Sequence, residues 1–425
     1  MPLSSGTEAE LVGLLHEAAE TLLAFPADTE ALGRVATSLT SLGEKDAAAV
    51  ALEALGQLGI ESGQVALGVA AVKLLERLGQ ETRAWALLSS LAHAFALGSP
   101  RVDPALPVRP RVPPPPKKGP PGAPRITLKV AKEKAKAAVA KVVAKTSEAP
   151  RTRPKLPCVP ILGSVDAALF QELVSVMDLG TRAKGDVVME VGEEARSLFL
   201  VARGALRVTR GEHELAIIRA GAFFGEIALL SGTTRTARVA CLDETWLLEV
   251  PREALEAAAA KSPRLADTIA SHAKKRLLAN TMRTSDLFAQ LASDEREVLV
   301  GRFTPSIFEA GATILKEGQD GDRLYVIVSG DAWVYKGSSV VAELHHGDLF
   351  GEASLITRKP AAANVVATTR TVTLSLDRAS FNNVALKHPA LLAEVYKTLI
   401  EREAVQTAAS VSTSPFIIEP DETVV

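Results

Sequence analysis

The chain has 425 residues, of which 47% are apolar but only 4% aromatic, and its net charge is −2. This length predicts roughly two to four domains, whose cores must be filled mainly by Leu, Val and Ala. The nearly neutral charge excludes a general attraction to nucleic acid or membranes. Two cysteines are too few for a disulfide framework. Because neither a signal peptide nor an apolar run of membrane-spanning length occurs, we expect a cytoplasmic protein without a membrane segment.

Residues 1–98 have the apolar periodicity of helices, beginning with a stripe that runs from Leu11 to Leu23. The dipeptide Leu42-Gly43 recurs 36 residues later as Leu78-Gly79. This period resembles the helix–turn–helix repeats of tetratricopeptide type, although a plain helical bundle explains the pattern equally well. Either arrangement predicts an all-α domain that provides an interaction surface rather than catalytic residues.

The composition changes sharply in residues 99–155. Eleven prolines lie between Pro100 and Pro124, which favours extended polyproline II structure. From Arg101 to Lys155 there are 15 Lys and Arg but three acidic residues, a net charge of +12. This composition predicts a largely disordered linker. The alternative is a basic arm that contacts the phosphates of a nucleic acid.

The remainder of the chain is a tandem duplication. Glycines in the first copy recur 126 residues later in the second, without a gap, as in Gly185 and Gly311 or Gly204 and Gly330. Glycines punctuate short apolar runs that read as strands, and an apolar helical stretch ends each copy. The two copies therefore predict two similar domains, which we place at residues 156–284 and 285–410, before a disordered tail at 411–425.

The most informative stretch lies within the first copy, from Phe224 to Val239. Gly225 and Glu226 open a short apolar helix, whose free backbone N–H groups and dipole favour an anion. Arg235 follows after a turn and can bind the same anion with the planar N–H donors of its guanidinium. Glu226 can only accept hydrogen bonds. A ligand that satisfies all of these groups carries a phosphate beside hydroxyl groups, as a ribose phosphate does.

This stretch resembles the phosphate-binding cassette of the cyclic-nucleotide-binding domain family, although Thr234 replaces the usual proline before the arginine. The resemblance implies that Glu226 holds the ribose 2′-hydroxyl and that Arg235 holds the cyclic phosphate. It also implies a mixed fold, with two tandem jelly-roll-like β-rolls of eight short strands, flanking helices and a preceding all-α domain. The candidate ligand-binding residues are Gly225, Glu226, Ile227, Ala228, Arg235, Thr236 and Ala237.

The second copy departs from the family pattern at the arginine. Its cassette keeps Gly351 and Glu352, but Ala361 occupies the arginine position. A hydrogen bond to a charged group contributes about 1.5–3 kcal/mol, so its loss weakens binding roughly tenfold to more than a hundredfold. We therefore expect a second site that is silent or holds a different ligand. Its candidate residues are Gly351, Glu352, Ala353, Ala361 and Ala362, with Arg358 or Lys359 as substitute phosphate contacts.

The choice between cyclic AMP and cyclic GMP stays open. The resemblance links a threonine at position 236 to cyclic GMP, whereas many cyclic AMP binders have alanine there. Neither a DNA-reading module nor a catalytic segment is recognised, and no metal or other cofactor is expected. The layout resembles the regulatory subunit of cyclic-AMP-dependent protein kinase without its pseudosubstrate sequence. We thus expect a non-enzymatic cyclic-nucleotide sensor that regulates an unidentified protein partner. The alternatives are a scaffold with ligand-silent β-rolls and nucleic-acid association through the basic linker.

Overall fold

The computed structural model describes residues 8–103, 127–147, 155–157, 159–284 and 302–385, together with 397 and 400. The predicted helical end of the second copy beyond residue 385 and the tail at 411–425 fall outside this part of the chain, apart from residues 397 and 400. The chain divides into two units, residues 1–230 with 234–272 and residues 231–233 with 273–425. Within the described residues, no helix is long and apolar enough to cross a membrane.

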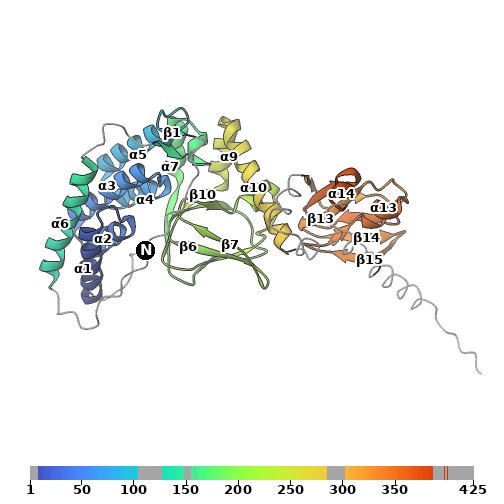
Figure 1. Cartoon of the computed structure of the whole chain (residues 1–425), viewed down its shortest axis with the longest axis horizontal. Coiled ribbons are helices and arrows are strands. Elements are labelled where there is room, and N and C mark those ends of the chain that lie inside the picture. Colours follow the sequence, from blue (N-terminus) through green and yellow to red (C-terminus); the bar gives the residue numbers. More distant parts are fainter. Residues whose placement is uncertain are drawn as a thin grey trace, which may run out of the picture. The chain divides into compact units, whose positions relative to one another are not determined.

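Five helices form the N-terminal region (Figure 1): α1 (Glu8–Ala24), α2 (Thr29–Ser41), α3 (Lys45–Ser62), α4 (Val65–Arg77) and α5 (Glu81–Phe95). The helix pair α2–α3 repeats as α4–α5 with the 36-residue spacing seen in the sequence. Gly43 and Gly79 follow α2 and α4 with φ angles of 76° and 75°. Glycine reaches this left-handed region without steric penalty, which explains why the Leu-Gly dipeptide recurs where each helix stops.

The predicted linker contains an ordered helix, which corrects the expectation of disorder for these residues. Helix α6 (Leu128–Ser147) packs against α1 and α3. Its buried side chains are small and recur with helical spacing, at Ala131, Ala135, Ala138, Val139 and Val142. Three of its lysines bind within the unit: Lys132 pairs with Glu44, Lys134 with Glu20, and Lys141 donates to the Leu23 carbonyl. The basic charge that suggested a nucleic-acid-binding arm therefore serves in part to hold α6.

Short elements connect this region to the first β-roll. Strands β1 (Val102–Asp103) and β2 (Leu156–Pro157) pair in parallel. The 3₁₀ turn η1 (Leu162–Ser164) and helix α7 (Ala167–Val176) follow. Asp166 caps α7 by accepting a hydrogen bond from the Leu169 N–H, 2.9 Å away. Helix α7 packs on α5 and on the roll, which joins the helical region to the roll within one unit.

The first roll consists of two four-stranded antiparallel sheets, as the family resemblance implied. One sheet has the order β3 (Asp178–Arg182), β10 (Thr245–Pro251), β5 (Ser197–Arg203), β8 (Phe223–Phe224). The other has the order β4 (Val187–Met189), β9 (Arg238–Cys241), β6 (Ala205–Arg210), β7 (His213–Arg219). Helix α8 (Glu226–Ser231) lies in the cassette, and α9 (Arg252–Lys261) and α10 (Pro263–Thr284) follow the last strand. A core that includes Phe199, Val201 and Leu206 fills the roll.

The second roll repeats this architecture in its own unit. One sheet has the order β11 (Thr304–Phe308), β18 (Thr371–Asp377), β13 (Arg323–Ser329), β16 (Leu349–Phe350). The other has the order β12 (Thr313–Leu315), β17 (Asn364–Ala367), β14 (Ala332–Lys336), β15 (Ser339–Leu344). Helices α13 (Glu352–Thr357) and α14 (Arg378–Ala385) correspond to α8 and α9. The predicted fold class, two tandem β-rolls with flanking helices behind an all-α region, is confirmed.

Candidate functional site

The cassette of the first roll begins where strand β8 turns sharply into helix α8. Gly225 makes this turn with a φ of 90°. A Cβ atom at this position would lie 2.8 Å from Nη1 of Arg235 and 3.3 Å from the carbonyl oxygen of Ser197. Glycine is therefore required for two reasons: a side chain would strain the backbone, and it would displace the guanidinium.

Glu226 is the first residue of α8 and is 1% exposed. Its carboxylate is thus held inside the cassette, at the amino end of a short helix, where a negative charge is favourable. Such a group accepts hydrogen bonds and donates none while it is ionised. In this position it is suited to receive the hydroxyl groups of a ligand.

Arg235 is 5% exposed and points back toward the start of the cassette. Its Nη1 donates to the Gly225 carbonyl at 2.9 Å, and its Nη2 donates to the Ser197 carbonyl at 2.7 Å. The guanidinium carbon lies 6.0 Å from the centroid of the Phe199 ring. A guanidinium has five N–H donors, so these two bonds orient the group and leave donors for an anion.

The electrostatics of Arg235 also favour an incoming anion. Burial lowers the pKa of its guanidinium, and the neighbouring charge of Arg252 acts in the same direction, while Glu193, Glu249 and Glu226 act against it. The ion pairs formed among the described residues do not include this arginine. A buried guanidinium that is hydrogen-bonded to two carbonyl groups is stabilised when a phosphate is placed beside it.

The backbone around Arg235 is fixed by a short antiparallel ladder. Its N–H donates to the Glu193 carbonyl at 2.7 Å, and its carbonyl accepts from the Gly192 N–H at 2.9 Å. Thr234 forms the adjoining bridge with Glu194. The same bridge forms in the second roll between Asp320 and Pro360. Threonine in place of proline therefore leaves the pairing of this turn unchanged.

The other candidate residues lie on both sides of Glu226 and Arg235. Ala228 and Ala237 are buried, whereas Ile227 and Thr236 are half-buried. The carbonyl of Thr236 accepts a hydrogen bond from Nη1 of Arg210 at 2.9 Å, which anchors the end of the cassette to strand β6. The structure thus brings the predicted residues of the first site together around one turn and one short helix.

Helix α10 approaches the cassette at its first turns. Leu265 and Ile269 are buried in the cluster that also contains Phe223 and Ala228. The ring of His272 meets the ring of Phe223 edge-on, with centroids 5.1 Å apart. Because Phe223 lies two residues before Gly225, the helix rests on the strand that enters the cassette.

The second roll repeats this frame without the arginine. Gly351 has a φ of 83°, and a Cβ there would lie 2.5 Å from the Arg323 carbonyl oxygen. Glu352 is buried as its counterpart is. Ala361 is 4% exposed, and its backbone pairs with Gln319 and Gly318 in the pattern seen at Arg235. The alanine therefore occupies the structural position of the arginine, not merely the aligned one.

The remaining residues of the second cassette are more accessible. Ala353 is half-buried and Ala362 is exposed. Arg358 and Lys359, the proposed substitute phosphate contacts, are both exposed. Arg358 has a φ of 59° at the end of α13, where the first roll has Gly232 with a φ of 63°. These two side chains are thus not enclosed in the cassette as Arg235 is.

Comparison with known proteins agrees with this geometry. Residues 181–262 and 305–388 each match the model of the cyclic nucleotide-binding domain. The chain contains two cyclic nucleotide-binding domains in tandem. No group of three or more potential metal ligands occurs among the described residues.

The relatives match about half of the chain. A cGMP-dependent protein kinase of Eimeria tenella is 29% identical over 223 residues, which cover 51% of this chain and 21% of the kinase. The cAMP-dependent protein kinase regulatory subunit of Dictyostelium discoideum is 30% identical over 213 residues, 47% of this chain and 63% of the subunit. The regulatory domain of Toxoplasma gondii PKA, solved with cAMP, is 23% identical with a TM-score of 0.28 and covers 58% of this chain and 92% of that domain. The chain thus matches less than two thirds of the length of these two kinase proteins.

Two contributors to the first domain were not among the residues predicted from the sequence. Ser197 holds the guanidinium through its carbonyl oxygen, and Phe199 lies beside it. Any residue supplies a carbonyl, so residue identity cannot reveal such a contact. The aromatic stack of Phe199 on Phe224 does leave a signal, because Tyr325 and Phe350 repeat it in the second domain.

Proposed function

We propose that the chain is a non-enzymatic sensor of cyclic AMP or cyclic GMP that regulates a protein partner. The observation that carries this proposal is the buried guanidinium of Arg235, which two backbone carbonyls orient beside the buried carboxylate of Glu226. A ribose cyclic phosphate supplies the anion and the hydroxyl group that these two side chains can bind. Gly225, Ile227, Ala228, Thr236 and Ala237 complete the proposed site.

The second domain is proposed to act without a phosphate contact of its own. It keeps the buried acceptor Glu352, but Ala361 leaves the charge of a cyclic phosphate without a buried cation at this position. We therefore expect that this domain either binds no ligand and has a structural role, or binds a ligand that lacks a phosphate. The named relatives include a regulatory subunit of a cAMP-dependent kinase and a cGMP-dependent kinase, which supports a regulated protein partner such as a kinase.

Calorimetric titration of the full chain with cyclic AMP and, separately, cyclic GMP tests the proposed function. Arg235→Ala should weaken binding roughly tenfold to a hundredfold, because a charged hydrogen-bond donor to the phosphate is lost. Arg238→Ala is the matched control, since Arg238 lies on the same segment but is exposed and pairs with Glu190 at the surface. Equal binding by the wild type and Arg235→Ala, or binding by neither, would contradict the proposal and favour a scaffold.

A further inference from the structure

The outer face of the first domain is occupied by the N-terminal helices. All seven residues of strand β5 are buried. Phe199 and Val201 belong to the core inside the roll, whereas Leu198, Leu200 and Ala202 belong to a second core that includes side chains of α1 to α7. Helix α4 packs on β3, β5 and β10 of this sheet. Because apolar residues line both faces of β5, the sheet requires a cover, and the helices provide it.

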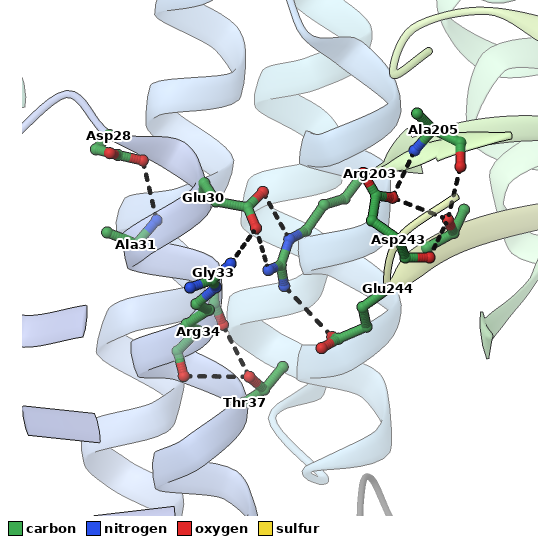
Figure 2. Close-up of polar contacts among 11 residues, drawn as sticks. Asp28, Glu30, Ala31, Gly33, Arg34, Thr37, Arg203, Ala205, Asp243 and Glu244 are labelled. Carbon is green, nitrogen blue, oxygen red and sulfur yellow. Dashed lines mark hydrogen bonds and ion pairs between the residues drawn. The ribbon is translucent and has the colours of Figure 1, made fainter. Parts of the chain in front are cut away.

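An ion pair between the buried Arg203 and the half-buried Glu30 fixes α2 at the end of the same strand (Figure 2). Nε of Arg203 donates to Oε2 of Glu30 at 2.9 Å, and Nη2 donates to the other carboxylate oxygen. Arg203 is 5% exposed and lies 5.2 Å from the centroid of the fully buried Trp246 ring. Nη1 is 3.5 Å from the carboxylate of Glu244. Such a bidentate pair has one preferred geometry and therefore fixes how the helices meet the sheet.

Strand β5 connects this ion pair to the candidate ligand site. Arg203 is its last residue, and Ser197, whose carbonyl holds Arg235, is its first. Strand β5 also pairs with β8, with Phe199 opposite Phe224. Phe224 precedes Gly225, which supplies the other carbonyl that holds Arg235. One strand therefore supports both acceptors of the guanidinium and carries the arginine that binds the helical region.

The cassette helix belongs to the same outer core. Ala228 and Leu229 of α8 are members of the buried cluster that contains the side chains of the N-terminal helices. Leu265 and Ile269 of α10 belong to it as well. Interiors of this kind are close-packed, so a displacement of the helices alters the packing beneath the cassette.

We propose that Glu30 and Arg203 are positioning residues for cyclic-nucleotide binding, through which docking of the N-terminal helices raises the affinity of the first domain. This inference rests on the proposed function of that domain. The docked helices hold β5 and β8 in the arrangement that orients Arg235 before the ligand arrives. Preorganisation of this kind strengthens binding, because the ligand does not have to order the site. By linkage, the bound nucleotide must stabilise the docked helices by the same factor.

The first test compares three full-length variants by calorimetry with cyclic AMP and cyclic GMP, at a temperature at which circular dichroism shows each to be folded. Glu30→Gln should weaken binding about fivefold or more, which is the lower range of coupling between sites. Glu53→Gln is the matched control, because Glu53 is also a half-buried helical-region glutamate paired with an arginine, but its partner Arg83 lies on helix α5 and not on the first roll. It should bind as the wild type does. Arg235→Ala serves as the reference for loss of the site itself.

A second measurement needs no substitution at the interface. Hydrogen exchange of the wild-type chain should slow in residues 29–41 and 65–77 when the tighter-binding nucleotide is added at saturation. A purely structural role of the ion pair would leave this exchange unchanged.

If the wild type binds and Glu30→Gln binds equally well, or if α2 and α4 exchange at the same rate with and without ligand, the coupling is overturned while the proposed function stands. If the wild type binds neither nucleotide, both are overturned. If Glu30→Gln does not fold, the exchange measurement decides.

Discussion

Arg235 donates to the backbone carbonyl of Ser197 at 2.7 Å across 38 residues of sequence. This contact joins the arginine of the cassette to the first residue of strand β5. The frame of the roll therefore orients the guanidinium. The consequences can be tested at the cassette, in the second domain, at the helical interface and at helix α6.

Replacement of Gly225 should disturb both the backbone and the arginine. In Gly225→Ala the added Cβ would meet Nη1 of Arg235 at 2.8 Å, so we expect destabilisation and at least a tenfold loss of nucleotide affinity. Gly211→Ala is the control, because Gly211 also has a positive φ, 53°, but a Cβ there meets nothing within 4 Å. It should lower stability by about 1–2 kcal/mol and leave affinity unchanged. If Gly225→Ala and Gly211→Ala changed the stability in denaturation and the nucleotide affinity in calorimetry equally, crowding of the guanidinium would have no effect on binding.

An arginine restored at position 361 should create a phosphate contact in the second domain. The backbone pairing of Ala361 matches that of Arg235, so Ala361→Arg places a guanidinium at the equivalent position. The same cassette contains the buried Glu352. We expect the stoichiometry of cyclic-nucleotide binding to rise from about one to about two per chain, because the missing charged donors are supplied. Ala362→Arg is the control, since Ala362 is exposed. A stoichiometry that stays the same in both variants would mean that the second cassette lacks more than the arginine.

The helical interface should weaken in acid. Burial would raise the pKa of Glu30, but the hydrogen bond and charge of Arg203, with a smaller contribution from Arg34, outweigh burial and hold that pKa below its ordinary value of 4.5. Arg203 is also faced by Glu244 and Asp243. A carboxylate with a lowered folded-state pKa contributes stability above the unfolded value, and this contribution is lost as the pH falls through the folded value.

We therefore expect the melting temperature of the chain to fall as the pH is lowered below about 4.5. Glu30→Gln removes the titrating group, so its melting temperature should vary less over this window. Glu53→Gln should retain the dependence of the wild type. Calorimetric scans of the three proteins between about pH 3 and pH 7 provide the measurement. If the melting temperatures of Glu30→Gln and the wild type varied identically with pH, the ion pair would have no role in acid stability.

Docking of α6 depends on small buried side chains. Ala138 is fully buried in α6, whereas its neighbour Ala137 is exposed. Ala138→Asp places an unpaired charge in the interface, which costs about 3 kcal/mol or more, and should release the helix from α1 and α3. Faster hydrogen exchange of residues 128–147 would report this release. Ala137→Asp carries the same substitution on the exposed face and should exchange as the wild type does, so equal exchange in both variants would show that α6 is held by its lysines alone.

The tandem β-rolls and the composition of both cassettes could be predicted from the amino-acid sequence. Gly225, Glu226 and Arg235 lie within eleven consecutive residues, and the 126-residue repeat identifies Ala361 as the counterpart of the arginine. These residues are close in sequence, so their order is visible without the fold, whereas the contact of Arg235 with the Ser197 carbonyl spans 38 residues and is not.

The way in which the helices support the first domain could not be predicted from the sequence. Glu30 and Arg203 are 173 residues apart, and no periodic pattern connects an ion pair at that distance. The proline and positive charge of residues 99–155 predict a disordered linker, yet Glu20 of α1 and Glu44 before α3 supply acidic partners for α6, and both helices supply the surface on which it packs. Periodicity reports which face of a segment is buried, but only the folded chain determines which distant segment covers that face.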